Sequence, residues 1–259
     1  SFRNQIFADV LAGIESVTSA HQYQTLIANY GYDPQREERE VLNLLSYNID
    51  GLILTGKQHT DRMIQYVRAS GIPVAELMDI GGQPLDIQVG FDNEKAGWDM
   101  AHAFLESGKR KIAFFGSMDD PRDLSRFRGT EQAVAACGLK AYHITPRTIS
   151  SVALGRQMFL QMQQSHPDID AIFCTNDDLA VGVLLECQAQ GIAVPQEIAI
   201  AGFHGLEIGR ARLQKIASVI TPRYDIGKTA SEILIARLAG KDAPDSVNLA
   251  YQIYYGDTL

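Results

Sequence analysis

The chain has 259 residues, 46% of them hydrophobic, and a formal net charge of −8. This length and apolar content are enough for one or two domains with complete cores. The acidic balance, with a single basic cluster at residues 109–111, argues against direct nucleic-acid binding, because neutralising phosphates requires a basic face. No apolar run is long enough to cross a bilayer, so we expect no membrane partner.

The three cysteines are Cys137, Cys174 and Cys187, an odd number placed within helical or strand-like patterns. They are typical of free thiols in the core of a protein from a reducing compartment. We therefore expect a cytoplasmic protein.

Strands and helices alternate along the first part of the chain. Strands are expected at 25–28, 51–54, 74–78 and 87–91. Helices are expected from Ile6 to Val17, from Pro34, from a Thr60 cap to Gly71, and from Glu94 to Gly108. Because a parallel sheet normally supplies a strand before its first helix, we expect that strand to lie outside the sequence.

The alternation restarts near Lys111. Strands are expected at 112–115, 141–144, 171–174, 198–201 and 218–221, and the tail alternates from 247 to 255 as one strand would. Helices are expected at 123–137, 152–164, up to Gly191, and 226–238. The restart predicts an α/β fold of two Rossmann-like lobes with parallel sheets and a ligand cleft between them.

Polar residues follow two neighbouring strands of the second half. Asn176 and Asp177 come after the strand 171–174, and His204 comes after the next one. Ligands of parallel α/β sheets sit beyond the carboxyl ends of the strands, so these residues predict a site for a polar small molecule. Helix capping is the alternative role for the residues from Thr175 to Asp178.

Signals for an enzyme are weak. The sequence has no dinucleotide-binding glycine pattern, no phosphate loop and no nucleophile elbow. It also has neither a His-x-x-x-His pair nor a Cys-x-x-Cys pair. We therefore expect no catalytic residues, no cofactor and no metal.

Several motifs occur in a fixed order along nearly the whole chain. They are Asp92-Asn93-x-x-Ala-Gly, Gly108-Lys-Arg-Lys-Ile, Arg126-x-x-Gly129, Phe173-Cys-Thr-Asn-Asp-Asp-Leu-Ala-Val-Gly182 and Val-Pro-x-x-Ile-Ala-Ile-Ala-Gly202-Phe203. In order and spacing the chain resembles the effector-binding domain of the lactose/galactose-repressor family. Residues 48–55, 76–79 and 200–205 are most similar to the gluconate-responsive members of that family.

The resemblance implies a lobe organisation and a set of partners. The N-terminal lobe would comprise 1–108 and 224–240, and the C-terminal lobe 109–223 and 241–259. The DNA-binding head of the family would be absent from this chain. Members of the family form homodimers, bind a small effector between the lobes and contact operator DNA through the head, so that ligand binding shifts the lobe arrangement and hence operator affinity.

The resemblance also implies ligand contacts for individual residues. Asp92, Arg126 and Asn176 match ligand-contacting positions of the family. Phe7 falls where an aromatic side chain often lies under the ligand, and Thr55 falls at a polar strand end. The alternatives are that Asp92 and Asn176 are helix caps, that Phe7 is a core residue and that Arg126 is a surface charge.

His204 is an informative departure from the family pattern. Many members that bind neutral sugars carry an aspartate at this position, whereas a histidine can supply a cation or an N–H donor. A sugar acid carries a carboxylate that an aspartate would repel and that Arg126 and His204 would attract. Arg3 is a weaker candidate for the same carboxylate. The alternative is a strand-end histidine that is satisfied within the protein.

The sequence therefore predicts the effector-binding and dimerisation domain of a bacterial transcriptional repressor that responds to gluconate or a related sugar acid. A periplasmic-type sugar-binding protein for uptake is the alternative, although free cysteines count against export. A third possibility, an α/β enzyme acting on a sugar acid, would need turnover, which none of these features requires.

Overall fold

The computed structural model of the chain describes residues 6–118 and 120–259. The chain divides into two compact α/β units, each formed from two separate stretches. Unit 1 contains the residues up to Asp92 together with Pro222–Ala250, and unit 2 contains Asn93–Thr221 together with Tyr251–Leu259. The expected fold class, two lobes with parallel sheets, is confirmed.

The observed division differs from the expected limits at 108 and 240. Helix α4 (Asn93–Glu106) belongs to unit 2 because it packs closely on α5 (Pro121–Ala136). A Cβ atom at Gly97 would lie 2.1 Å from the carbonyl oxygen of Arg126, so the two helices touch backbone to backbone. Strand β9 (Ser246–Asn248) belongs to unit 1 because it pairs in parallel with β3 (Ile87–Gly90).

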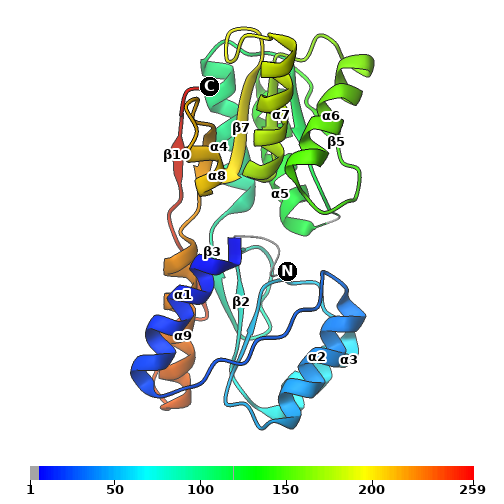
Figure 1. Ribbon diagram of the computed structural model, residues 1–259. Helices are drawn as coiled ribbons and strands as arrows, with labels where there is room; N and C mark the ends of the chain where they lie inside the picture. Colours follow the sequence, from blue (N-terminus) through cyan, green and yellow to red (C-terminus); the bar gives the residue numbers. More distant parts are fainter. Residues whose placement is uncertain (1–5, 119) are drawn as a thin grey trace. The chain divides into compact units, whose positions relative to one another are not determined.

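Unit 1 has a four-stranded sheet in the order β1-β2-β3-β9, in which all the pairs are parallel. Helices α1 and α9 pack together on one face of the sheet, and α2 and α3 lie on the other (Figure 1). Its remaining elements are α1 (Ile6–Thr18), a 3₁₀ turn (Ser19–His21), α2 (Pro34–Ser46), β1 (Leu52–Leu54), α3 (Asp61–Ser70), β2 (Val74–Leu77) and α9 (Arg223–Leu238).

The helices of unit 1 begin and end where the capping residues predict. The carboxylate of Asp33 accepts hydrogen bonds from the amides of Gln35 and Arg36 at the start of α2. The Thr60 hydroxyl accepts one from the Met63 amide, 3.1 Å away, at the start of α3. Gly71 ends α3 in the left-handed conformation, with φ 70°, which a glycine adopts without strain.

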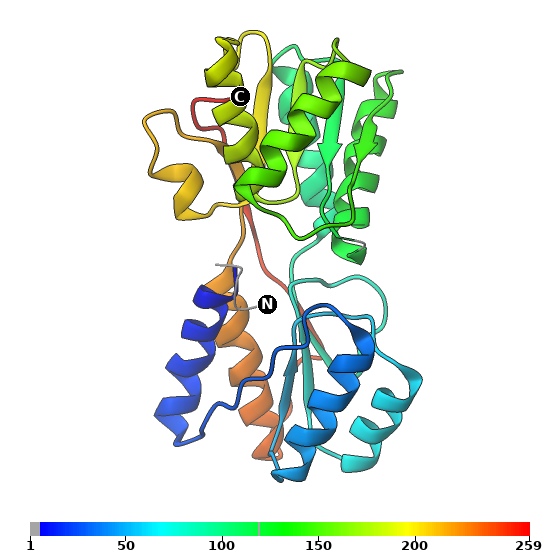
Figure 2. The same ribbon diagram turned by 45° about the vertical axis from the view of Figure 1, so that its right-hand side comes forward.

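The strand expected at 25–28 is wrong. Residues 23–30, all of them described, belong to no helix or strand. Both views show this segment crossing unit 1 from α1 to α2 (Figures 1 and 2). Its composition is strand-like, but a strand requires a hydrogen-bonded neighbour, and local propensity alone does not supply one.

Unit 2 has a six-stranded sheet in the order β10-β8-β7-β6-β4-β5, parallel except for β10. Helices α4 and α5 pack as one pair, and α6 and α7 as another. The remaining elements of unit 2 are β4 (Ile112–Phe115), β5 (Tyr142–Ile144), α6 (Val152–Ser165), β6 (Ala171–Cys174), α7 (Asp177–Gln190), β7 (Ala199–His204), α8 (Glu207–Arg210), β8 (Ala217–Ile220) and β10 (Gln252–Tyr254).

The two faces of this sheet carry different cores. Aliphatic and sulfur-containing side chains of α6 and α7 pack on one face, around residues such as Met158, Leu184 and Cys187. A row of phenylalanines covers the other face: Phe114 and Phe173 lie edge-to-face with ring centroids 5.4 Å apart, and Phe203 follows at 6.1 Å from Phe173. Aromatic pairs at these separations add to the free energy that burial alone provides.

The single strand expected for the tail is also wrong. The tail forms two short strands, and each joins a different sheet: β9 pairs with β3 and β10 pairs with β8. Alternation of apolar and polar residues indicates an extended backbone. It does not show that the whole segment pairs within one sheet. The short helix α8 was not expected either.

Two of the three thiols lie in the core. Burial raises the pKa of Cys174 well above its usual value and that of Cys187 to about 12, so both stay protonated. Cys137 ends α5 and is exposed, which contradicts its expected place in the core. Among the described residues no helix has the length and apolarity needed to span a membrane.

The basic cluster at residues 109–111 makes contacts within the protein. Arg110 donates to the carbonyl oxygen of Leu105 in the last turn of α4, 2.8 Å away, which suits a cation that follows a helix. Lys109 donates to the carbonyl oxygens of Pro195 and Gln196, and Lys111 pairs with Asp168.

A buried charged cluster in unit 1 links α2, β2 and the loop that follows β1. His59 lies between Glu37 of α2 and Glu76 of β2, with Nδ1 2.6 Å from Glu37 Oε2 and Nε2 3.3 Å from Glu76 Oε1. Burial lowers the pKa of His59, but the bonds to the two carboxylates outweigh this effect and raise its pKa to about 9. Because both acceptors are carboxylates, both ring nitrogens donate and the imidazole is cationic.

We expect His59→Gln to lower the free energy of unfolding at pH 6 by on the order of 3 kcal/mol, since each pKa unit corresponds to about 1.4 kcal/mol. A raised pKa stabilises the fold fully below the unfolded value near 6.5, and this contribution is lost as the pH rises through about 9. Urea unfolding at pH 6 and pH 9.5 measures it.

The control is His102→Gln, which removes an exposed histidine paired with Glu106 and should change the free energy of unfolding by less than about 0.5 kcal/mol. A difference between wild type and His59→Gln that stays the same at both pH values would contradict the charged state of His59.

Candidate functional site

Buried polar side chains gather at one edge of the unit 2 sheet. Strands β4, β6, β7 and β8 run parallel, so their carboxyl ends meet at that edge. The loops and helices that follow these ends supply the side chains, and most of them are nearly inaccessible to solvent: Ser117, Asp123, Arg126, Thr175, Asn176, His204 and Thr221. Such an edge is where parallel α/β sheets bind ligands.

Arg126 is the centre of this cluster. It lies on α5 and is only 3% exposed, which excludes the alternative role of a surface charge. Its Nε donates to Asn93 Oδ1 at 2.9 Å, and its Nη1 donates to the carbonyl and hydroxyl oxygens of Thr175 at 3.1 and 3.0 Å. The guanidinium carbon lies 3.8 Å from the centre of the Phe203 ring, a stacked cation–π arrangement.

Asp123 provides the opposite charge. Its Oδ1 lies 3.6 Å from Arg126 Nη1 and accepts a short hydrogen bond from the Thr175 hydroxyl, and its Oδ2 accepts one from the Ser117 amide at 3.1 Å. Burial raises the pKa of Asp123, although the neighbouring Arg126 opposes this effect. The pair thus fixes the guanidinium in one position.

Asn176 precedes α7 but does not cap it with its side chain. Its Nδ2 instead donates to the Ser150 hydroxyl, 2.8 Å away, in the loop before α6. This bond holds the amide in one orientation beside Thr175. The geometry disfavours the alternative that Asn176 is only a helix cap.

Asp177, in contrast, is committed to the fold. Its Oδ1 accepts a bond from the Ser218 hydroxyl at 2.6 Å, and its Oδ2 accepts one from the Leu206 amide. It therefore ties the start of α7 to the turn that follows His204. A Cβ atom at Gly202 would lie 2.2 Å from Asp177 Oδ1, so only glycine permits this approach.

His204 ends β7 with a positive φ of 91° and is 3% exposed. Its Nδ1 lies 3.2 Å from the Thr221 hydroxyl, and its ring meets Phe203 edge-on at 5.0 Å. A non-glycine residue at positive φ carries strain that its surroundings must offset. Arg126 and His204 thus both contact the ring of Phe203.

The remaining candidates belong to unit 1. Thr55 directly follows β1 and Asp92 follows β3, so both lie at the carboxyl edge of that parallel sheet. Phe7 lies in the first turn of α1 and, like Thr55, lines a groove within unit 1. Arg3 lies outside the described residues.

The cluster in unit 2 offers fixed hydrogen-bond donors and acceptors, a guanidinium and an imidazole. No group of three or more potential metal ligands occurs within residues 6–118 and 120–259. Donors and acceptors held in this way are suited to hydrogen bonding with a polar, hydroxylated molecule.

Comparison with known proteins decides the family. Residues 1–256 match the family model for periplasmic binding proteins and the sugar-binding domain of the LacI family. The chain is 53% identical to the HTH-type transcriptional regulator IdnR of Escherichia coli K12. The match covers the whole of this chain and 79% of IdnR. The chain belongs to the LacI family. This confirms the resemblance that the motifs indicate.

Other relatives of this LacI-family chain agree. It is 45% identical to the HTH-type transcriptional regulator GntR of Escherichia coli K12, in a match that covers all of this chain and 78% of that protein. Its fold superposes with a TM-score of 0.97 on the crystal structure of the transcription regulator GntR from Chromobacterium violaceum, at 33% identity, covering all of this chain and 96% of that one.

The sequence did not point to every residue of the cluster. Asp123, Thr175 and Phe203 all contact Arg126, although none of these three was predicted as a ligand-binding residue. Two signals were present: Asp123 lies one helical turn before Arg126, and Thr175 and Phe203 adjoin Asn176 and His204. Ser150 had no such signal, because the loop that carries it comes close only through the fold.

We expect Thr175→Val to lower the free energy of unfolding by about 1–3 kcal/mol. Valine has nearly the same shape as threonine but no hydroxyl, so Asp123 and Arg126 each lose a buried hydrogen-bond partner. Thermal and urea unfolding monitored by circular dichroism measure the change. Thr148→Val removes an exposed hydroxyl that bonds within its own loop and serves as the matched control. Equal stability of both variants would show that the Thr175 hydroxyl is not a structural partner of the pair.

Proposed function

We propose that this chain is the effector-binding domain of a LacI-family transcriptional repressor and that its effector is gluconate or a closely related sugar acid. The observation that carries the proposal is the pair of buried nitrogen donors, Arg126 and His204, at one sheet edge beside Asn176. The names of the relatives, which are transcriptional regulators, support the regulatory part.

Charge supports a sugar acid over a neutral sugar. A carboxylate gains charge-assisted hydrogen bonds from a guanidinium, about twice as strong as bonds between neutral groups, and an imidazole can add an N–H donor. Where many family members that bind neutral sugars have an aspartate, this chain has His204, which removes a negative charge from the proposed site. The stacking of Arg126 on Phe203 preorganises the guanidinium, so little conformational entropy is lost on binding.

Asn176 suits the hydroxyl groups of such a ligand because an amide both donates and accepts hydrogen bonds. The proposal keeps Asp92, Thr55 and Phe7 as contributions of unit 1, and Arg3 as a further candidate. Effector binding would change operator affinity by favouring one arrangement of the two units, and only by as much as it binds the two arrangements differently. The partners proposed are a second copy of the chain and operator DNA through a separate head domain, which places the protein in the cytoplasm.

A sugar-binding protein for uptake is the second candidate, since the matching family model includes periplasmic binding proteins. Sedimentation equilibrium separates the two, because transport receptors are usually monomers and repressors of this family are dimers. A concentration-independent monomer would favour the uptake protein.

The proposed ligand class is tested by a thermal-shift screen across aldonates, their phosphates and neutral hexoses. A ligand that binds only the folded state raises the melting temperature, by an amount that grows with its concentration over Kd. We expect aldonates to raise it and neutral hexoses to have little effect. A screen in which a neutral hexose gives the largest shift would overturn the sugar-acid assignment.

The roles of the two donors are tested by calorimetry. We expect Arg126→Lys and His204→Asp each to weaken gluconate binding roughly tenfold or more. Lysine lacks the planar fork that binds a carboxylate through two bonds, and aspartate replaces an N–H donor with a negative charge that repels the carboxylate. Arg126→Lys keeps the charge but loses the planar fork, so it limits the damage to the fold. Binding of glucose, where measurable, should change much less.

Lys140→Ala is the control, because it removes an exposed positive charge from the same unit and should leave both affinities unchanged. Circular dichroism verifies that each variant is folded. Equal losses for gluconate and glucose would contradict the charge argument while leaving the position of the site intact.

A further inference from the structure

Two side chains of the polar cluster contact residues at which the chain passes from one unit to the other. Three connections link the units, and the residues of unit 2 at these connections are Asn93, Thr221 and Tyr251. Asn93 accepts a hydrogen bond from Arg126 Nε at 2.9 Å. The Thr221 hydroxyl lies 3.2 Å from His204 Nδ1. Each of the two proposed effector donors is therefore one hydrogen bond away from a connection.

The first connection is the peptide between Asp92 and Asn93. Asp92 follows β3 of unit 1, and Asn93 is the first residue of α4 in unit 2. Asn93 is 1% exposed, so water hardly competes for its bond to Arg126. Because α4 touches the backbone of Arg126 at Gly97, the helices that carry the two partners form one support. A shift of the guanidinium on this support changes the bond at Asn93, one peptide bond from Asp92.

The second connection is the peptide between Thr221 and Pro222. Thr221 directly follows β8 and is 4% exposed, and α9 of unit 1 begins at Arg223. A residue before proline is restricted to extended conformations, and proline itself has a nearly fixed φ. This connection therefore has little conformational freedom, so that a displacement of Thr221 also displaces the start of α9.

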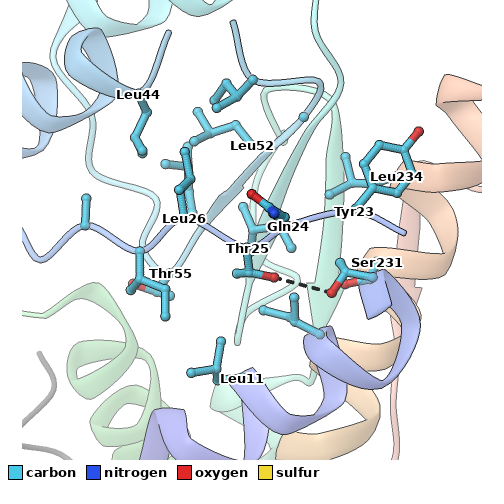
Figure 3. A pocket seen from close by; sticks show the side chains of 18 of the residues that line it. Leu11, Tyr23, Gln24, Thr25, Leu26, Leu44, Leu52, Thr55, Ser231 and Leu234 are labelled. Carbon is cyan, nitrogen blue, oxygen red and sulfur yellow. Dashed lines mark hydrogen bonds between the residues drawn. The ribbon is translucent and has the colours of Figure 1, made fainter. Parts of the chain in front are cut away.

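Helix α9 is in close contact with the rest of unit 1. A Cβ atom at Gly227 would lie 2.0 Å from the carbonyl oxygen of Val10, so α9 and α1 touch backbone to backbone. Leu11 of α1 and Leu234 of α9 line the same pocket of unit 1 as Thr55 (Figure 3). A displacement of α9 therefore reaches the surroundings of Thr55, a proposed contribution of unit 1 to the effector site.

The third connection, between Ala250 and Tyr251, is held in a different way. The Tyr251 hydroxyl donates to Asp99 of α4, and Asp99 also pairs with Lys95 of the same helix at 2.8 Å. This bond anchors the connection to α4 and not to one of the two proposed donors. The three connections thus differ in what holds them, although all three join the same two units.

We propose that Asn93 and Thr221 are positioning residues of the effector site and that they couple Arg126 and His204 to two of the three connections. This coupling rests on the proposed function, in which the two donors meet the effector. When the effector carboxylate engages the donors, Asn93 and Thr221 shift with them. Coupling between binding and conformation is reciprocal, so the loss of either bond weakens effector binding as well as the response at its connection.

The test compares hydrogen exchange, followed by mass spectrometry, with and without gluconate in the wild-type chain, Asn93→Ala and Thr221→Val. Gluconate, or the aldonate that gives the largest thermal shift, is used at a concentration that calorimetry shows to be saturating for each chain. In the wild type we expect exchange to slow at least fivefold at residues 91–94 and 219–224. Asn93→Ala should lose the slowing at 91–94 only, and Thr221→Val should lose it at 219–224 only.

Both variants should also weaken binding of the aldonate about threefold to tenfold, which corresponds to the net contribution of one hydrogen bond. Neither should change the response at residues 249–252, because the third connection is held by Asp99. Tyr251→Phe, which removes that bond, is the matched control and should leave the responses at the other two connections as they are in the wild type.

Conservative variants separate coupling from damage to the fold. Asn93→Asp keeps an oxygen acceptor for Arg126, and Thr221→Ser keeps the hydroxyl beside His204. Both should respond to the aldonate as the wild type does. If Asn93→Ala does not fold, the comparison of Thr221→Val with Thr221→Ser decides the question by itself.

The possible failures are distinguishable. Slowing that persists at both connections in each variant, or that disappears at both in a single variant, would overturn the coupling and leave the proposed function in place. Equal behaviour of the conservative and the non-conservative variants would do the same. A wild-type chain that binds no aldonate would overturn the proposed function, and the coupling with it.

Discussion

The candidate site depends on one constraint, which is that a buried guanidinium must be fully accommodated by its surroundings. Removing a charge from water costs several kcal/mol unless hydrogen bonds and an opposite charge replace the hydration shell. Arg126 meets this requirement through Asn93, Thr175 and Asp123 and through the face of Phe203. These partners come from different elements, so the position of the guanidinium reports that α4, α5, β6 and β7 are all correctly placed.

The glycines of α4 and α5 make this convergence possible. Because Gly97 and Gly129 have no side chain, the backbones of the two helices are in contact. A Cβ atom at Gly129 would lie 1.8 Å from the carbonyl oxygen of Glu94. The close approach brings Asn93, the first residue of α4, within reach of Arg126. Arg126 of α5 is thus held by the first residue of α4, and the glycine of each of the two motifs makes that contact possible.

Much of this architecture was predictable from local signals. Capping residues such as Asp33 and Thr60, and apolar runs such as 171–174, predicted helices and strands close to where they lie. Arg126, Asn176 and His204 were predicted to be site residues, and they lie at one edge of one sheet. The signals failed where the outcome depends on a distant partner. Residues 25–28 have strand propensity without a neighbour, the tail is shared by two sheets, and α4 follows a strand of unit 1 while packing in unit 2.

The unequal environments of the three thiols have a practical consequence. Cys174 and Cys187 are enclosed and protonated, whereas Cys137 is exposed at the end of α5, the helix that carries Arg126. A maleimide fluorophore would therefore attach to Cys137 in the native chain without removal of the other two cysteines. Such a label follows the last turn of α5 while Arg126 lies in its second turn, so it would provide an optical signal from the helix that carries the guanidinium without touching the polar cluster.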